Sequence, residues 1–96
     1  MKSLHRRAAR RDSSEGPIVD ALEARGFSVQ PISAKDVPDL LIGRDNITRV
    51  AEVKTGTKAL RPGQVRWWGN WRGGAAIVLR DVEDVARLDR AWSSLR

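Results

Sequence analysis

The feature that most constrains this 96-residue chain is Pro38-Asp39, followed after twelve residues by Glu52-Val53-Lys54. Asp39 is expected to lie at the end of one β-strand and to close it, with Glu52 inside the next strand. Because successive strand residues point to opposite faces, Glu52 and Lys54 then share a face while Val53 turns to the core. An unpaired carboxylate within an apolar strand is costly, so Glu52 requires a partner.

Two kinds of partner would satisfy Glu52. The first is a plain ion pair with Lys54 or an arginine, in which case Asp39 is only a turn residue that follows proline. The second is a hard divalent cation such as Mg²⁺ or Mn²⁺, which prefers oxygen ligands. A lysine beside such a cation can hold the attacking water and offset charge that develops on a phosphate. The shared face of Glu52 and Lys54 favours the metal site.

Helix and strand signals along the chain predict one α/β domain. Caps, apolar stripes and turn formers such as Asp45-Asn46 mark the element ends. The expected elements are a helix from Ser13 or Ser14 to Gly26, strands over 27–32, 37–43 and 48–54, a helix from Arg61 or Pro62 to Trp71, a strand over 75–79, and a helix capped by Asp81. The order αβββαβα describes a mixed four-stranded sheet flanked by helices.

The residues around this pattern resemble the PD-(D/E)XK nucleases. The stretches "VPDLLIGR", "VAEVKTG" and "LRPGQVRWWGNWRG" are similar to small stand-alone VRR-NUC nucleases, a group that includes phage-type Holliday junction resolvases. The likeness runs from about Ser14 to Leu79. Val37 departs from the small residue or Gly that usually precedes Pro-Asp, which leaves the catalytic positions intact. The resemblance implies a restriction-endonuclease-like core and a DNA endonuclease that uses Mg²⁺ or Mn²⁺.

The same resemblance implies roles for individual residues. The implied catalytic group is Asp39, Glu52, Lys54 and Gln64. The implied metal ligands are Glu15, Asp39, Glu52 and the main-chain carbonyl of Val53. Alternatively, Glu15 is only a carboxylate favoured near a helix N-terminus, and Glu23 is a weaker substitute for it as a ligand.

Positive charge is concentrated near the N-terminus, on Lys2, Arg6, Arg7, Arg10 and Arg11. Residues 12–96 carry the other 13 Lys/Arg against 12 Asp/Glu, a net charge of +1. We therefore expect a disordered basic tail over 1–12, which is either a DNA-tracking arm or a solvated end, before a single domain over 13–96. Candidate DNA contacts, with ordinary solvated charges as the alternative, are Arg6, Arg7, Arg10, Arg11, Lys58, Arg61 and Arg66.

A helical stripe follows the nuclease-like motif. Gln64, Trp67, Trp68 and Trp71 share one helix face. A tryptophan stripe usually lies in a core, which is the expectation for Trp67 and Trp71. The alternative is that one tryptophan stacks on an unpaired base or on a dimer partner. A buried amide at Gln64 needs a hydrogen-bond partner.

Composition argues against several other classes of protein. The chain has no cysteine, so disulfides and thiolate zinc sites are excluded. No apolar run approaches the ~20 residues of a membrane span, and no glycine-rich nucleotide loop or signal-peptide h-region occurs. We expect neither a membrane association nor a nucleotide cofactor, and a cytoplasmic location in a bacterium or a phage-infected host cell.

The Asp39, Glu52 and Lys54 pattern, together with the resemblance to VRR-NUC nucleases, implies a metal-dependent, structure-specific DNA endonuclease similar to a Holliday junction resolvase. Two nicks in a four-way junction suit a symmetric pair of sites, so a homodimer is expected. One alternative is a monomeric flap or single-strand nuclease. The other is a catalytically inactive DNA-binding module of the same fold, which Asp39 and Glu52 disfavour because binding alone needs no carboxylates facing phosphate.

Overall fold

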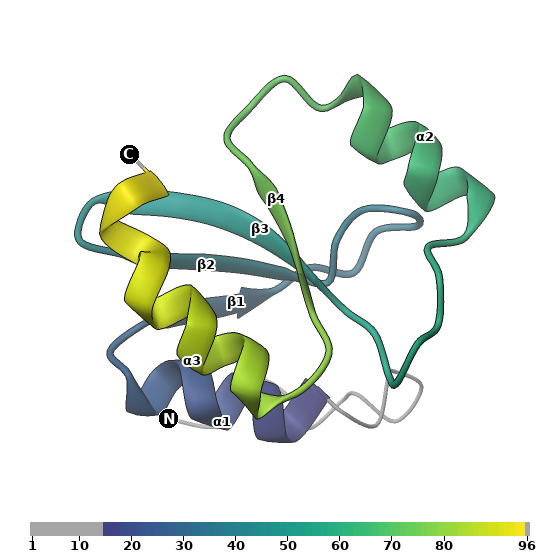
Figure 1. Ribbon diagram of the computed structural model, residues 1–96. Coiled ribbons are helices and arrows are strands. Elements are labelled where there is room, and N and C mark those ends of the chain that lie inside the picture. Colours follow the sequence, from purple (N-terminus) through teal and green to yellow (C-terminus); the bar gives the residue numbers. More distant parts are fainter. Residues whose placement is uncertain (1–14, 96) are drawn as a thin grey trace.

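A computed structural model describes residues 15–95, and it has the predicted order of elements (Figure 1). The elements are α1 Glu15–Ala24, β1 Ser28–Pro31, β2 Leu40–Arg44, β3 Ile47–Val53, α2 Pro62–Asn70, β4 Ala76–Leu79, α3 Val82–Ala91 and a short 3₁₀ helix, η2, over Trp92–Leu95. The predicted tail over 1–12 and the predicted caps Ser13 and Ser14 lie outside the described residues. No helix within 15–95 is long and apolar enough to cross a membrane.

The four strands form one mixed sheet in the order β1-β2-β3-β4, which confirms the predicted α/β class. β1 pairs with β2 and β2 with β3 in antiparallel fashion, and β3 pairs with β4 in parallel. Asp45 and Asn46 join β2 to β3 with φ of 56° and 64°, the left-handed conformation that a tight hairpin turn needs. Sequence and structure therefore agree on the hairpin that carries the central motif.

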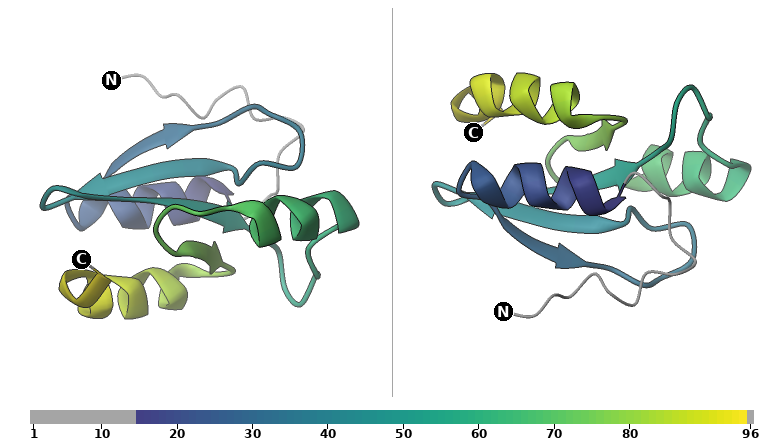
Figure 2. Two further views of the ribbon diagram at one scale, coloured as in Figure 1. Left: turned by 90° about the horizontal axis from the view of Figure 1, so that it is seen from above. Right: turned by 90° about the horizontal axis from the view of Figure 1, so that it is seen from below.

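The hydrophobic core lies between the sheet and the two helices α1 and α3. These helices lie side by side, whereas α2 stands apart from both (Figures 1 and 2). Strand alternation gives one face of the sheet to this core, and Val53 points into it as predicted. The core side chains are Ile18, Val19, Leu22, Phe27, Leu40, Ile42, Ile47, Ala51, Val53, Leu79, Val85, Leu88 and Trp92.

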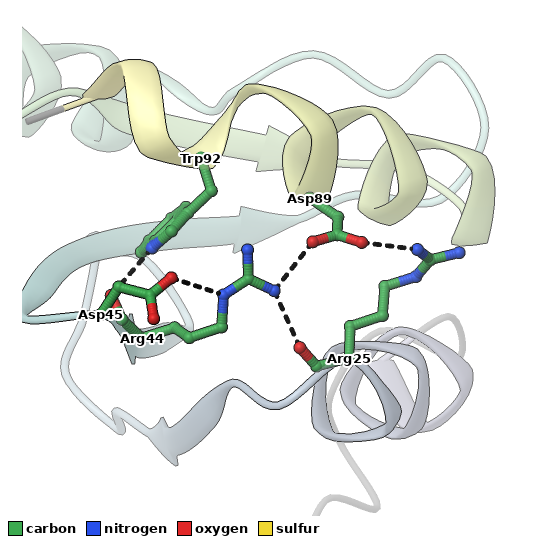
Figure 3. Close-up of polar contacts among 5 residues, drawn as sticks. All are labelled: Arg25, Arg44, Asp45, Asp89 and Trp92. Atoms are coloured by element: carbon green, nitrogen blue, oxygen red, sulfur yellow. Dashed lines mark hydrogen bonds and ion pairs between the residues drawn. The ribbon is translucent and has the colours of Figure 1, made fainter.

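Arg44, at the end of β2, joins the sheet to α1 and α3 (Figure 3). Its Nη1 donates to Asp89 Oδ1 and to the Arg25 carbonyl, both at 2.8 Å. Its guanidinium also lies 4.2 Å from the centroid of the Phe27 ring. The hydrogen bond from Arg44 lowers the pKa of the Asp89 carboxyl. Arg44 therefore holds the sheet to the helices at one end of β2, whereas Asp39 lies at the other end.

The prediction for the start of β2 was wrong by three residues. The strand begins at Leu40 rather than at Val37, so Asp39 precedes the strand and does not close it. Two local features explain why the strand starts late. Asp36 has φ of 67°, which turns the chain, and Pro38 has no N–H to give to a strand ladder. Asp39 nevertheless lies at an end of β2.

Trp92 should contribute most to stability among the tryptophans. It is fully buried, its ring meets Phe27 edge to face at 4.8 Å, and its Nε1 donates to the Arg44 carbonyl at 2.9 Å. Trp92→Ala should lower the free energy of unfolding by about 3–5 kcal/mol, the usual cost of deleting a buried large aromatic ring. Trp71→Ala, at a ring that is 43% exposed, is the control and should cost much less in the same urea titrations. Equal losses would contradict the assignment of Trp92 to the core.

Candidate active site at the end of strand β3

The register of β2 and β3 brings Asp39 and Glu52 together. Leu40 pairs with Ala51, so the residue before Leu40 lies beside the residue after Ala51. Asp39 Oδ2 accepts a hydrogen bond of 2.9 Å from the Val53 N–H. The Asp39 carbonyl accepts another, of 2.7 Å, from the N–H of Ile32. Hydrogen bonds from Val53 and Ile32 thus hold Asp39 in place just before β2.

Glu52 is buried at the centre of a polar cluster on the sheet face opposite α1 and α3. Its Oε2 accepts a 2.7 Å hydrogen bond from Gln64 Nε2 and lies 3.7 Å from Lys54 Nζ. Glu52, Lys54 and Gln64 are 3%, 6% and 3% exposed. The second carboxylate oxygen, Oε1, is buried and has no hydrogen-bond partner among residues 15–95. The structure thus brings Glu52, Lys54 and Gln64 together and leaves one acceptor oxygen of Glu52 without a hydrogen bond from residues 15–95.

Gln64 is oriented by its own helix. Its Oε1 accepts a 2.8 Å hydrogen bond from the Arg61 N–H, just before the first residue of α2. Because an amide has an acceptor at one end and donors at the other, this bond directs Nε2 toward Glu52. The predicted need for a partner at Gln64 is confirmed. Gln64 is also the sole buried residue of α2.

Arg80 holds the loop between Lys54 and α2, a role that the sequence analysis missed. Its Nη1 donates to the carbonyls of Gly56 and Lys58, at 2.9 and 2.8 Å. The Lys54 N–H also donates to the Leu79 carbonyl at 3.2 Å. Arg80 lies 22 and 24 residues from its two partners in sequence, so no local pattern marks it. It fixes the path by which the chain passes from Lys54 toward Gln64.

Burial and a neighbouring charge make ionisation of Glu52 unfavourable. Burial, and secondarily the negative charge of Asp39, raises the pKa of Glu52 to about 7. The hydrogen bond from Gln64 and the charges of Lys54 and Arg61 act in the opposite direction but do not cancel the effect. Near neutral pH, an additional positive charge at this place would favour the ionised carboxylate.

The donor set fits a hard cation at two carboxylates. Glu52 Oε1 is a buried oxygen with spare acceptor capacity, and Asp39 supplies a second carboxylate beside it. Within residues 15–95, no group of three or more Asp, Glu, His or Cys side chains is arranged to hold a metal ion. Glu15 is buried, at 2% exposure, in the first turn of α1. Glu23, its weaker substitute, is exposed on the same helix.

The predicted DNA contacts divide into two sets. Lys58, Arg61 and Arg66 are exposed on the loop and helix that follow Lys54. Arg61 also makes an ion pair of 3.6 Å with Asp36. The four arginines of the predicted tail lie outside the described residues; these are Arg6, Arg7, Arg10 and Arg11.

The prediction that Trp67 and Trp71 are core residues was wrong. Trp71 is 43% exposed and Trp67 is half-buried, because α2 does not pack into the core between the sheet and the other helices. The two rings stack on each other instead, with centroids 4.9 Å apart and planes at 17°. The tryptophan of the core is Trp92.

No protein-family model, curated protein or solved structure matches this chain.

The raised pKa of Glu52 predicts a pH-dependent effect of Glu52→Gln. Between about pH 4.5 and 7 the folded protein holds a proton on Glu52 that the unfolded chain has released. The stability of the parent protein therefore falls as pH rises through this window, and Glu52→Gln removes that loss. The variant should gain stability relative to the parent from about pH 5 to about pH 8 in EDTA, measured by urea unfolding. The exposed Glu23→Gln is the control, and a pH-independent difference for Glu52→Gln would contradict the prediction.

Proposed function

We propose that this protein is a metal-dependent DNA endonuclease with a PD-(D/E)XK-type core that hydrolyses phosphodiester bonds. The observation that carries the proposal is the buried carboxylate of Glu52. It has an available oxygen, Asp39 lies beside it, and Lys54 Nζ lies 3.7 Å from its other oxygen. The resemblance to small VRR-NUC nucleases supports the same assignment.

A structural ion pair explains this cluster less well. The separation of 3.7 Å between Lys54 Nζ and Glu52 Oε2 exceeds that of a charge-assisted hydrogen bond, about 2.7–2.9 Å. The pKa of Glu52 is raised to about 7, so the stabilisation of its charge by Gln64 and Lys54 does not offset the cost of burial and of the neighbouring Asp39 charge. Buried ion pairs that serve stability usually have their remaining acceptors satisfied by hydrogen bonds, and Oε1 of Glu52 is not satisfied within residues 15–95.

Each residue has a definite role in the proposed site. Asp39, Glu52 and the Val53 carbonyl would hold Mg²⁺ or Mn²⁺. Glu15, the further ligand that the resemblance implies, is not grouped with both of these carboxylates within residues 15–95. When bound, the cation polarises the phosphate and lowers the pKa of a bound water. The Lys54 ammonium group would lie beside the reacting phosphate. Its positive charge would stabilise the negative charge that develops there in the transition state. Gln64 orients the Glu52 carboxylate through its Nε2, and in the proposed site it also positions the water or the phosphate.

Branched DNA is the proposed substrate, with a four-way junction as the first candidate. A domain of this size contacts a short stretch of duplex, so symmetric cleavage of a junction requires two copies related by a two-fold axis. Lys58, Arg61 and Arg66 would contact phosphates and position the strand without reading its sequence.

Substitution of the clustered residues should abolish cleavage. Asp39→Asn, Glu52→Gln and Lys54→Ala each remove a ligand or a charge that acts on the transition state, and each should lower the rate on the order of 10²-fold or more. The assay compares labelled four-way junction, flap, duplex and single strand with Mg²⁺, Mn²⁺ or EDTA. Glu23→Gln changes an exposed carboxylate and should cleave like the parent. If any of the three variants is folded and still cleaves at the parental rate, the assignment of the active site is wrong.

Binding of the cation should be measurable without DNA. Mn²⁺ in excess over its dissociation constant should raise the melting temperature of the parent protein by mass action. Because Glu52 must ionise to bind the cation, the rise should be larger at about pH 8 than at about pH 6. The double variant Asp39→Asn, Glu52→Gln is the control. An equal rise in that variant would show that the cation binds elsewhere.

A further inference from the structure

The positive charge of the described residues is segregated along the chain. Residues 53–80 contain no Asp or Glu, although residues 12–96 together carry a net charge of only +1. The basic residues of this segment are Lys54, Lys58, Arg61, Arg66, Arg72 and Arg80. The segment starts beside Glu52 and includes Gln64, so the positive charge adjoins the proposed site. Four of these side chains are exposed, namely Lys58, Arg61, Arg66 and Arg72, and exposed positive charge attracts a polyanion.

The same segment presents a fixed aromatic ring. Trp71 is 43% exposed, and one face of its indole stacks on Trp67. Its Nε1 donates a 2.7 Å hydrogen bond to the Gly74 carbonyl. A Cβ at Gly73 would collide with the Trp71 ring, so a glycine is needed there for this close approach. The polar edge of the ring is thus satisfied within the chain, and the ring is held in one orientation before any ligand binds.

Charge decides which kind of ligand suits this ring. Arg66 and Arg72 are exposed and flank the tryptophans in sequence. Binding sites for single-stranded nucleic acid combine positive charge along the backbone path with aromatic rings on which bases stack. A second copy of the chain that docked symmetrically here would bring the same positive charges face to face. The ring therefore suits a nucleic acid better than a second copy of this chain.

We propose that Trp71, backed by Trp67 and flanked by Arg66 and Arg72, stacks on an unpaired base of the bound DNA strand. The inference rests on the proposed nuclease function and specifies its substrate. Trp71 lies seven positions after Gln64, about 10 Å along a helix, so a strand cleaved beside Gln64 reaches Trp71 within a few nucleotides. Bases of a continuous duplex are already stacked on one another. The ring would therefore favour DNA with unpaired bases near the cleaved phosphate, as at a branch or a flap.

The test compares substitutions at Trp71 that separate stacking from apolar packing. Fluorescein-labelled oligothymidine and a blunt duplex of equal length are titrated with full-length protein in EDTA, so that no turnover is needed. Trp71→Leu keeps apolar bulk but loses the ring, and it should weaken oligothymidine binding on the order of ten-fold. Trp71→Phe keeps a ring and should lose much less. Val65→Ala, at a 55% exposed residue of the same helix, is the matched control and should bind like the parent.

Duplex binding should change little in all three variants, and urea unfolding checks that each remains folded. Equal affinity of the parent and Trp71→Leu for oligothymidine would overturn the proposal. Equal losses on single strand and duplex would also overturn it, because stacking on an unpaired base predicts a selective loss. A dimer in sedimentation that Trp71→Leu abolishes, with oligothymidine affinity unchanged, would make a second copy the occupant.

The inference and the nuclease proposal fail in different experiments. Selective loss of oligothymidine binding in Trp71→Leu, in a protein that cleaves nothing, would support the stacking surface and reject the nuclease. Cleavage by the parent together with unchanged oligothymidine binding by Trp71→Leu would support the nuclease and reject the stacking surface.

Discussion

The antiparallel register of β2 and β3 places two carboxylates side by side where burial makes their joint ionisation unfavourable. Asp45 and Asn46 set this register, because a tight turn with two left-handed residues fixes which residues pair. A slip of one residue would turn Glu52 into the core and Val53 out of it. The apolar core therefore enforces the register, and the register assembles the polar cluster. Burial of the Glu52 carboxylate beside Asp39 is electrostatically unfavourable, and hydrophobic packing on the opposite face of the sheet stabilises this arrangement.

Much of this arrangement could be predicted from the sequence, because it depends on local rules. Strand alternation gives the shared face of Glu52 and Lys54, and it sends Val53 to the core. The element order follows from turn formers and apolar runs. The start of β2 was misplaced because a valine before proline looks like a strand residue, whereas Asp36 and Pro38 end the extended pairing there. The contacts of Arg80 could not be predicted, because they join segments that are far apart in the sequence.

The tryptophans of α2 illustrate a second limit of sequence patterns. A helical stripe establishes which residues share a face, but it does not establish what that face meets. Trp67 and Trp71 share a face and stack on each other, yet the core between the sheet and the helices α1 and α3 is completed by Trp92. The charge segregation was visible in the sequence, but a net charge of +1 for residues 12–96 conceals a segment without acidic residues. Averages over a domain hide such local asymmetry.

Few contacts determine where α2 sits. Gln64 is its sole buried residue, and its amide joins the Arg61 N–H to the Glu52 carboxylate. Gly63 lies so close to Asp36 that a Cβ there would collide with the carboxyl group. Trp71 directly follows the last residue of α2, and its N–H donates to the Trp68 carbonyl, so contacts that fix α2 at Gln64 and Gly63 also influence where Trp71 lies. The helix thus links the carboxylate cluster to the exposed ring. A substitution at Gln64 would therefore affect both the Glu52 carboxylate and the position of Trp71.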